Sequence, residues 1–186
     1  PKVYLPLAAP KATRDEQVKK CRDLNTLENN GKNIMVKSIS TIIFDWGRTL
    51  HDPVTNTLFD GVIELIPELS KKYTLALVSL AKIDTPEVRR KMIDESGIAE
   101  YFQIVLVGGE NKDEMYERVL SEFNISPEKV AVIDDRTVKG IAWGNRKGAL
   151  TVWFKNGKFA DELPDEQTGH PSFTVATIPE LKKIFI

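Results

Sequence analysis

The chain has 186 residues, of which 41% are hydrophobic and 28% charged, a composition typical of a folded globular protein. Its 26 basic and 27 acidic side chains leave a formal net charge of −1, so no global field attracts nucleic acid or an anionic membrane. One cysteine and two histidines exclude a disulfide framework and disfavour a zinc site, and without a leader-like or membrane-spanning apolar segment we expect a cytoplasmic protein.

The first 35 residues differ in pattern from the rest of the chain. Three prolines punctuate residues 1–10, apolar residues at helical spacing predict one helix within residues 14–27, and residues 28–33 have the composition of a linker. We therefore expect residues 1–35 to form an N-terminal extension, as a helix or a mobile arm, and residues 36–186 to form the compact domain.

From residue 36 onward, short apolar runs alternate with amphipathic stretches. The predicted strands are residues 39–44, 74–78, 102–107, 129–133 and 150–154. The predicted helices are residues 61–72, 85–96, 112–123 and 138–146, followed by a late extended element at 174–177 and a terminal helix at 178–186. Strands that alternate with helices predict an α/β fold in three layers, a parallel sheet with helices on both faces.

Polar residues follow the predicted strands. Asp45 follows the first strand, Ser79 the second, Lys112 lies at the helix start after the third, and Asp134 and Asp135 follow the fourth. Because ligands bind beyond the carboxyl ends of the strands in such sheets, these side chains should converge on one edge. Carboxylates suit Mg²⁺ or a nucleophile that forms an acyl phosphate, and a lysine and a hydroxyl can hold phosphoryl oxygens. The set therefore predicts chemistry on a phosphate group.

These motifs resemble those of the haloacid dehalogenase superfamily of phosphohydrolases, over residues 36–186. The apolar strand that ends in Asp45-Trp46-Gly47-Arg48-Thr49 is similar to the family's first motif, an apolar strand followed by Asp-x-Asp-x-Thr. Ser79 and Lys112 match its second and third motifs, and Asp134-Asp135 matches the paired acids of its fourth. Four motifs in the right order make a specific signal, whereas each alone would be weak.

The resemblance implies a role for each matching residue. Asp45 would attack phosphorus, Lys112 and Ser79 would position and neutralise the phosphoryl oxygens, and Thr49 would support the loop after the first strand. Arg48 beside this loop either crowds it or binds an anionic group. The implied cofactor is Mg²⁺. Its expected ligands are Asp45, the carbonyl of Gly47, Asp134 and Asp135.

Two positions depart from the family pattern. Gly47 replaces the second Asp of the first motif, the residue that protonates the leaving oxygen and later activates water, so we expect slowed turnover. The carbonyl that contacts the metal is kept by Gly47. Gly140 stands where a later acidic residue often lies, and Asp134 would supply the missing carboxylate. His51 is interpreted as a loop residue or a backup acid–base, and Trp46 as a packing residue or a substrate contact.

The spacing between motifs leaves no room for a large cap domain. Only 33 residues separate Asp45 from Ser79 and 32 separate Ser79 from Lys112. The carbon–halogen and carbon–phosphorus cleaving branches, which need a cap, therefore fit less well than a capless, Rossmann-like phosphatase core. An open site would accept a phosphorylated small molecule or macromolecule, and the oligomeric state stays open.

We therefore expect a Mg²⁺-dependent phosphoric monoester hydrolase that works through an aspartyl phosphate on Asp45. The alternative is a catalytically silent protein of the same fold that binds a phosphorylated ligand or a protein partner. The alternative is motivated by Gly47, Arg48 and the N-terminal segment.

Overall fold

The computed structural model describes residues 35–81, 85–109 and 111–186. The expected N-terminal extension lies, apart from Met35, outside the described residues. No helix in the described part of the chain combines the length and the apolar character needed to cross a membrane.

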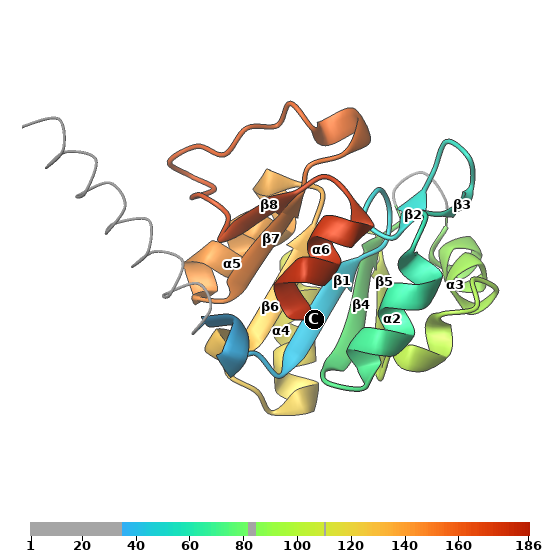
Figure 1. Cartoon of the computed structure of the whole chain (residues 1–186), viewed down its shortest axis with the longest axis horizontal. Helices are drawn as coiled ribbons and strands as arrows, with labels where there is room; N and C mark the ends of the chain where they lie inside the picture. The colour runs from blue at the N-terminus through green and yellow to red at the C-terminus, as the bar shows by residue number, and fades with distance from the viewer. Residues whose placement is uncertain (1–34, 82–84, 110) are drawn as a thin grey trace, which may run out of the picture. The chain divides into compact units, whose positions relative to one another are not determined.

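Six parallel strands form one sheet in the order β5-β4-β1-β6-β7-β8 (Figure 1). The strands are β1 Thr41–Asp45, β4 Thr74–Leu80, β5 Ile104–Gly108, β6 Val130–Asp134, β7 Leu150–Phe154 and β8 Phe173–Val175. β1, β6 and β7 are buried along their whole length, as expected when helices cover both faces of a parallel sheet.

Helices cover both faces of this sheet (Figure 1). On one face α2 (Val62–Ser70), α3 (Pro86–Asp94) and α6 (Ile178–Phe185) contribute side chains to the core that contains Ile42 and Phe44. On the other face α4 (Lys112–Phe123) and α5 (Ala142–Lys147) pack around Ile43. Alternate residues of β1 thus enter opposite cores, as the two-residue period of a strand requires. The predicted three-layer α/β fold is confirmed.

Two features differ from the sequence prediction, and a third lies in a segment for which no element was predicted. A hairpin of β2 (His51–Asp52) and β3 (Thr57–Leu58) follows β1 and was not predicted. The helix predicted over 138–146 is wrong at its start, because a kinked turn at Thr137–Ile141 precedes the shorter α5. Residues 155–172 join β7 to β8 with a single turn of 3₁₀ helix at Gly157–Phe159 and no strand.

Further single turns of 3₁₀ helix at Ala99–Tyr101 and Pro127–Lys129 precede β5 and β6.

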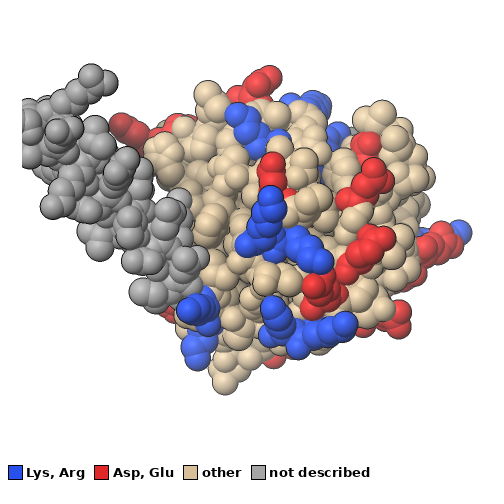
Figure 2. All heavy atoms as spheres, in the orientation of Figure 1, with Lys and Arg blue, Asp and Glu red and all other residues tan. Residues whose placement is uncertain are grey.

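The surface over α2 and α6 mixes both signs of charge, as Figure 2 shows. The ion pair between Lys182 and Glu68 joins these two helices there. This face carries no field of a single sign, in keeping with the near-neutral net charge of the chain.

The strand order reverses beside β1. The chain runs from β1 to β4 and β5 on one side, and then returns to place β6 on the other side of β1. The carboxyl ends of β4, β1 and β6 therefore lie next to one another at the point where an α/β sheet ordinarily binds its ligand.

Candidate functional site

The predicted site residues meet at this edge of the sheet. Asp45 ends β1, Ser79 is the next-to-last residue of β4, Asp134 ends β6, and Lys112 begins α4. All four side chains are buried, although each is polar. The side chain of Asn111 caps α4 by accepting a hydrogen bond from the Asp113 N–H, which fixes the first helical turn where Lys112 lies.

Lys112 bridges two carboxylates inside the protein. Its Nζ lies 2.6 Å from Asp45 Oδ1 and 2.6 Å from Asp134 Oδ2, and the side chain is only 4% exposed. Burial opposes the charge of Lys112, but the adjacent carboxylates of Asp134 and Asp45 raise its pKa well above the usual range for lysine. Lys112 is therefore held as a cation between the ends of β1 and β6.

Both carboxylate oxygens of Asp134 accept hydrogen bonds from protein groups. Besides Lys112, Oδ2 accepts from the Tyr116 hydroxyl at 2.9 Å and the Gly140 N–H at 3.0 Å, and Oδ1 accepts from the Arg136 N–H at 2.9 Å. A Cβ at position 140 would lie 2.5 Å from Asp134 Oδ2, so this close approach requires glycine. The structure thus places the Asp134 carboxylate as the anchor of Lys112.

Asp45 and Asp135 have fewer protein partners. Asp45 Oδ2 accepts a hydrogen bond from Thr49 Oγ1 at 3.1 Å, and burial raises the pKa of Asp45 although Lys112 opposes the shift. Asp135 Oδ2 is buried without a hydrogen-bond partner among the described residues. Burial, with a smaller contribution from Asp45 and Asp134, raises the pKa of Asp135 to about 9.

The three carboxylates fit a divalent cation. Asp45, Asp134 and Asp135 each offer an oxygen, and these oxygens lie within 4.8 Å of one another. Hard oxygen ligands suit Mg²⁺, and a cation there would give the orphaned Asp135 Oδ2 a partner. Asp134 Oδ2 already accepts three hydrogen bonds, whereas Asp134 Oδ1 accepts one from the Arg136 N–H, so Asp45, Asp135 and Asp134 Oδ1 have capacity left for an ion.

Gly47 and Arg48 form the tight loop after β1. The Arg48 N–H donates to the His51 carbonyl at 2.7 Å, and Arg48 has a φ of 65°, in the left-handed region that favours glycine. The Arg48 side chain extends toward Phe159, with its guanidinium carbon 5.3 Å from the ring centroid.

Arg89 enters the site from α3 and was not predicted from the sequence. Its Nη1 donates to Ser79 Oγ at 3.4 Å, a long hydrogen bond, and lies 3.5 Å from where a Cβ on Gly47 would be. A cation thus occupies the space beside Gly47. One sequence signal could have found Arg89. The helix predicted after the second strand begins at the edge of the site, and its first turns include this arginine.

A cavity of about 360 Å³ is lined by Asp45, Lys112 and Arg89, among others, and is called the basic cavity below. Among the described residues two carboxylates, Asp45 and Asp135, line it together with five basic side chains: Arg48, Arg89, Lys112, Arg136 and Lys139. The β7–β8 connection contributes Phe159, and its Glu162 binds Arg136 Nε at 2.7 Å. The excess of positive charge suits a ligand with several negative oxygens.

Comparison with known proteins gives a family and several relatives. Residues 5–154 match the family described as haloacid dehalogenase-like hydrolase. The glyceraldehyde 3-phosphate phosphatase of Pyrococcus furiosus is 31% identical over 70 residues, which are 38% of this chain and 29% of that protein. The phosphoserine phosphatase of Thermus thermophilus is 24% identical over 122 residues, which are 63% of this chain and 46% of that protein. The chain thus spans less than half the length of either relative.

Solved structures share the fold. A haloacid dehalogenase-like hydrolase from Streptococcus pneumoniae superposes with a TM-score of 0.65 at 16% identity, over 81% of this chain and 100% of that chain. A putative hydrolase of the same family from Bacillus subtilis, bound to magnesium, superposes with a TM-score of 0.58 at 22% identity, over 69% of this chain and 56% of that chain.

Proposed function

The chain belongs to the haloacid dehalogenase-like hydrolases. We propose that it is a Mg²⁺-dependent phosphatase that acts on phosphate monoesters. The observation that carries the proposal is the buried ion cluster, in which Lys112 holds Asp45 at the floor of a basic cavity. Two curated relatives are phosphatases, which supports the same reaction class.

Asp45 is the proposed nucleophile. One of its carboxylate oxygens forms a bond to phosphorus while the bond from phosphorus to the leaving oxygen breaks, which gives an aspartyl phosphate. Water then attacks phosphorus, which releases phosphate and restores the Asp45 carboxylate. Thr49 and Lys112 fix the orientation of this carboxylate through the hydrogen bonds that they donate to it.

Asp45, Asp134, Asp135 and the carbonyl of Gly47 would hold the Mg²⁺, and Asp134 Oδ2 would also position Lys112. Bound Mg²⁺ supplies positive charge that offsets the repulsion between the phosphoryl oxygens and the carboxylates. Lys112 binds the phosphoryl oxygens. Ser79 is buried and is not one of the described residues that line the cavity, so it would act on these oxygens through Arg89, which donates to its hydroxyl. Arg48 and Arg136 line the cavity and attract the anionic substrate.

Arg89 is proposed to face the leaving oxygen. Gly47 has no side chain that could donate a proton to the leaving oxygen. Arg89 Nη1 lies 3.5 Å from the position that a Cβ on residue 47 would occupy. A guanidinium stays charged and stabilises a developing negative charge without giving up its proton. The reaction should therefore be slow with poor leaving groups, which need a proton.

We also propose that residues 36–186 are a hydrolase core of the capless kind. In the described residues only the β2–β3 hairpin and α2 lie between β1 and β4. The hairpin and the β7–β8 connection supply His51, Asn56 and Phe159 to the mouth of the basic cavity, where a cap would otherwise contribute.

The covalent intermediate provides the test. The protein is mixed with an aryl phosphate and Mg²⁺, quenched in acid within one turnover, digested and examined by mass spectrometry. We expect a phosphate adduct on the peptide that contains Asp45. Turnover with an adduct on another residue, or with none at any quench time, would contradict the mechanism.

Binding without turnover is the second candidate function, because Gly47 removes the acid and Arg89 fills its space. It predicts tight, metal-dependent binding of phosphate esters with no release of phosphate. Measured turnover of any ester that depends on Asp45 would exclude it.

A further inference from the structure

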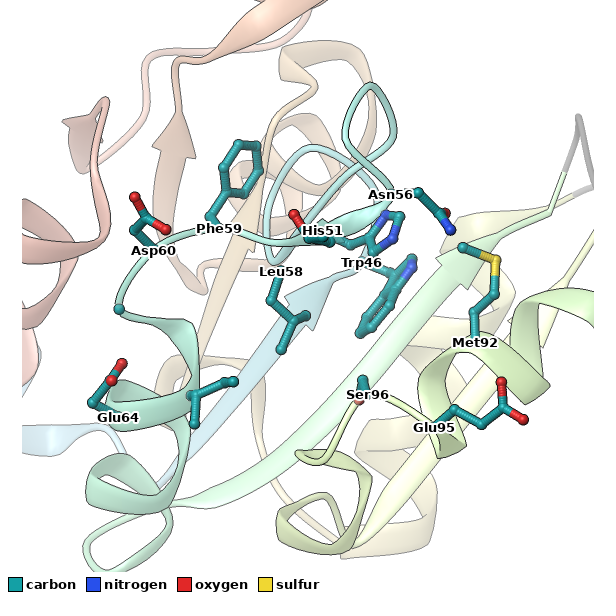
Figure 3. Close-up of a pocket in the computed structure, with 13 residues that line it drawn as sticks. Trp46, His51, Asn56, Leu58, Phe59, Asp60, Glu64, Met92, Glu95 and Ser96 are labelled. Carbon is teal, nitrogen blue, oxygen red and sulfur yellow. The ribbon is translucent and has the colours of Figure 1, made fainter.

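A second cavity has a volume of about 520 Å³, and Figure 3 draws the residues that line it. Its walls come from the β2–β3 hairpin, the start of α2 and the end of α3. Three residues, His51, Asn56 and Met92, line both cavities, so the two spaces meet at these side chains. A ligand whose phosphate lies at Asp45 could therefore extend its other end into the second cavity.

The second cavity, here the acidic cavity, has the opposite charge. Asp60, Glu64 and Glu95 line it, and no lysine or arginine is among the described residues that do so. Glu95 pairs with Lys91 at 3.8 Å, whereas Asp60 and Glu64 have no ion pair within the described part of the chain. Asp60, which follows the hairpin, and Glu64, which lies in α2, are thus acidic residues of this cavity without an ion-pair partner among the described residues.

A buried hydrogen-bond donor also lines the acidic cavity. Trp46 is fully buried, yet its Nε1–H finds no acceptor among the described residues. Its ring stacks on His51, with centroids 5.1 Å apart, and Figure 3 shows the nitrogen at the end of the ring nearer Asn56 and Met92. An unsatisfied buried donor is costly, so an acceptor atom of a ligand at this junction would remove a penalty. Met92 has a flexible side chain that can move aside for such a ligand.

The remaining wall is apolar. Leu58, Ile63 and Met92 line the acidic cavity, and Ile63 is 59% exposed although it is a large hydrophobic residue. An aliphatic chain that crosses the cavity would cover this surface. The lining is complementary to a ligand with a hydrogen-bond acceptor near Trp46, an apolar stem, and a positive charge near Asp60 and Glu64.

We propose that the acidic cavity binds the leaving group of the substrate, and that this leaving group is an alkyl chain ending in an ammonium group. The inference rests on the proposed phosphatase function and names its substrate class, the amine-bearing phosphate monoesters. The ester oxygen lies at the junction near Trp46, the stem lies on the apolar wall, and the ammonium lies between Asp60 and Glu64.

A series of ω-aminoalkyl phosphates, from two to six carbons, serves as a ruler for the cavity. Each is compared with the ω-hydroxyalkyl phosphate of the same length, which differs by one positive charge. Binding to the 186-residue chain with Asp45→Asn in Mg²⁺ is measured by calorimetry, so the result does not depend on turnover. At one or two chain lengths we expect the amine to bind at least about fivefold more tightly than the alcohol, the effect of two exposed carboxylates.

The same titration is repeated with Asp60→Asn and Glu64→Gln added together. The control pair, Glu100→Gln and Glu128→Gln, removes the same charge at the amino end of the sheet, where these residues precede β5 and β6. The preference for the amine should disappear in the first protein and persist in the control. Equal binding of amine and alcohol at all lengths, or a preference that survives in the first protein, would overturn the assignment.

Turnover of an aryl phosphate by the wild-type protein separates the two proposals. An aryl phosphate has no ammonium and makes no use of Asp60 or Glu64. If the Asp45→Asn protein binds amine and alcohol equally while the wild-type protein turns over the aryl phosphate, only the substrate class is overturned. Absence of aryl turnover overturns the proposed function.

Discussion

Lys112 is the residue on which the geometry of the site depends. It is the cation that forms ion pairs with both Asp45 and Asp134, and it is almost completely buried. A buried charge cluster is sensitive to the loss of one partner, because the remaining charges keep their desolvation cost without their attraction.

Replacing Lys112 with Met should therefore destabilise the protein by about 3–5 kcal/mol. Urea unfolding at pH 7 measures the change. Lys139→Met is the matched control, because Lys139 lies at the mouth of the basic cavity and is only partly buried, and we expect a change within about 0.5 kcal/mol. Equal effects of the two substitutions would show that the buried ion pairs contribute nothing.

Arg89 decides what an acid at position 47 can do. Gly47→Asp alone would place a carboxylate beside the Arg89 guanidinium. The ion pair would lower the pKa of the new carboxyl group, which would then stay ionised and have no proton to donate. We expect Gly47→Asp to leave alkyl phosphate hydrolysis slow, and the double variant with Arg89→Met to raise the ratio of alkyl to aryl turnover about tenfold or more. The measurement is kcat/KM for one alkyl and one aryl phosphate. If Gly47→Asp alone raises the ratio of alkyl to aryl turnover as much as the double variant does, the new carboxylate is not held in an ion pair by Arg89.

At the scale of elements, the turn at Thr137–Ile141 lets the chain pass close to β6. The Gly140 N–H donates to Asp134, and a Cβ on residue 140 would meet both Asp134 and the Tyr116 hydroxyl at 2.5–2.6 Å. The kink before α5 and the position of Asp134 therefore depend on the same glycine.

Gly140→Ala should cost about 1–3 kcal/mol of stability, because the new methyl group must displace Asp134 or the turn. Activity should fall as well, since Asp134 positions Lys112. Gly109→Ala is the control, because a Cβ there has no atom within 4 Å. Thermal unfolding of both variants measures the difference, and an unperturbed Gly140→Ala protein would be inconsistent with this packing.

The sequence predicted the elements whose signals are local and strong. The apolar runs that became β1, β4, β6 and β7 are buried on both sides, so their composition was sufficient. The β2–β3 hairpin was missed because each strand has only two residues, too few for a periodic pattern. The start of α5 was misplaced because the close approach of Gly140 to Asp134 joins residues that only the tertiary fold brings together.

The same distinction applies to the candidate site. Asp45, Ser79, Lys112 and Asp135 follow strands in a recognisable order, and the structure brings them to one edge. Arg89 lies in the middle of an amphipathic helix, where an arginine ordinarily indicates a solvated face. Three of the four donors to Asp134 come from α4 and the turn, and no local pattern could assign them to it; only the Arg136 N–H is close in sequence.

For the whole molecule, the carboxylate cluster links stability to pH. The pKa of Asp135 is about 9 in the metal-free fold, against about 4 in an unfolded chain, so between these values the folded state keeps a proton that the unfolded state has lost. Stability should therefore be greatest below pH 4 for this group and fall as pH rises toward 9, by up to about 1.4 kcal/mol per pH unit.

Urea unfolding in EDTA between pH 5.5 and 8 tests this dependence. Asp135→Asn should flatten it, because the asparagine does not titrate. Added Mg²⁺ should stabilise the wild-type protein most at high pH, where its binding requires ionised carboxylates. Metal-free stability that rises with pH across this range would contradict the pKa of Asp135.

The most direct measurement is phosphate release from an aryl phosphate, with and without Mg²⁺, by the wild-type and Asp45→Asn proteins. An aryl leaving group needs little protonation and so tolerates the absence of an acid at Gly47. The proposed function predicts turnover that requires Mg²⁺ and vanishes in Asp45→Asn. Turnover that persists in Asp45→Asn would exclude Asp45 as the nucleophile, and no turnover in either protein would leave binding as the function of this fold.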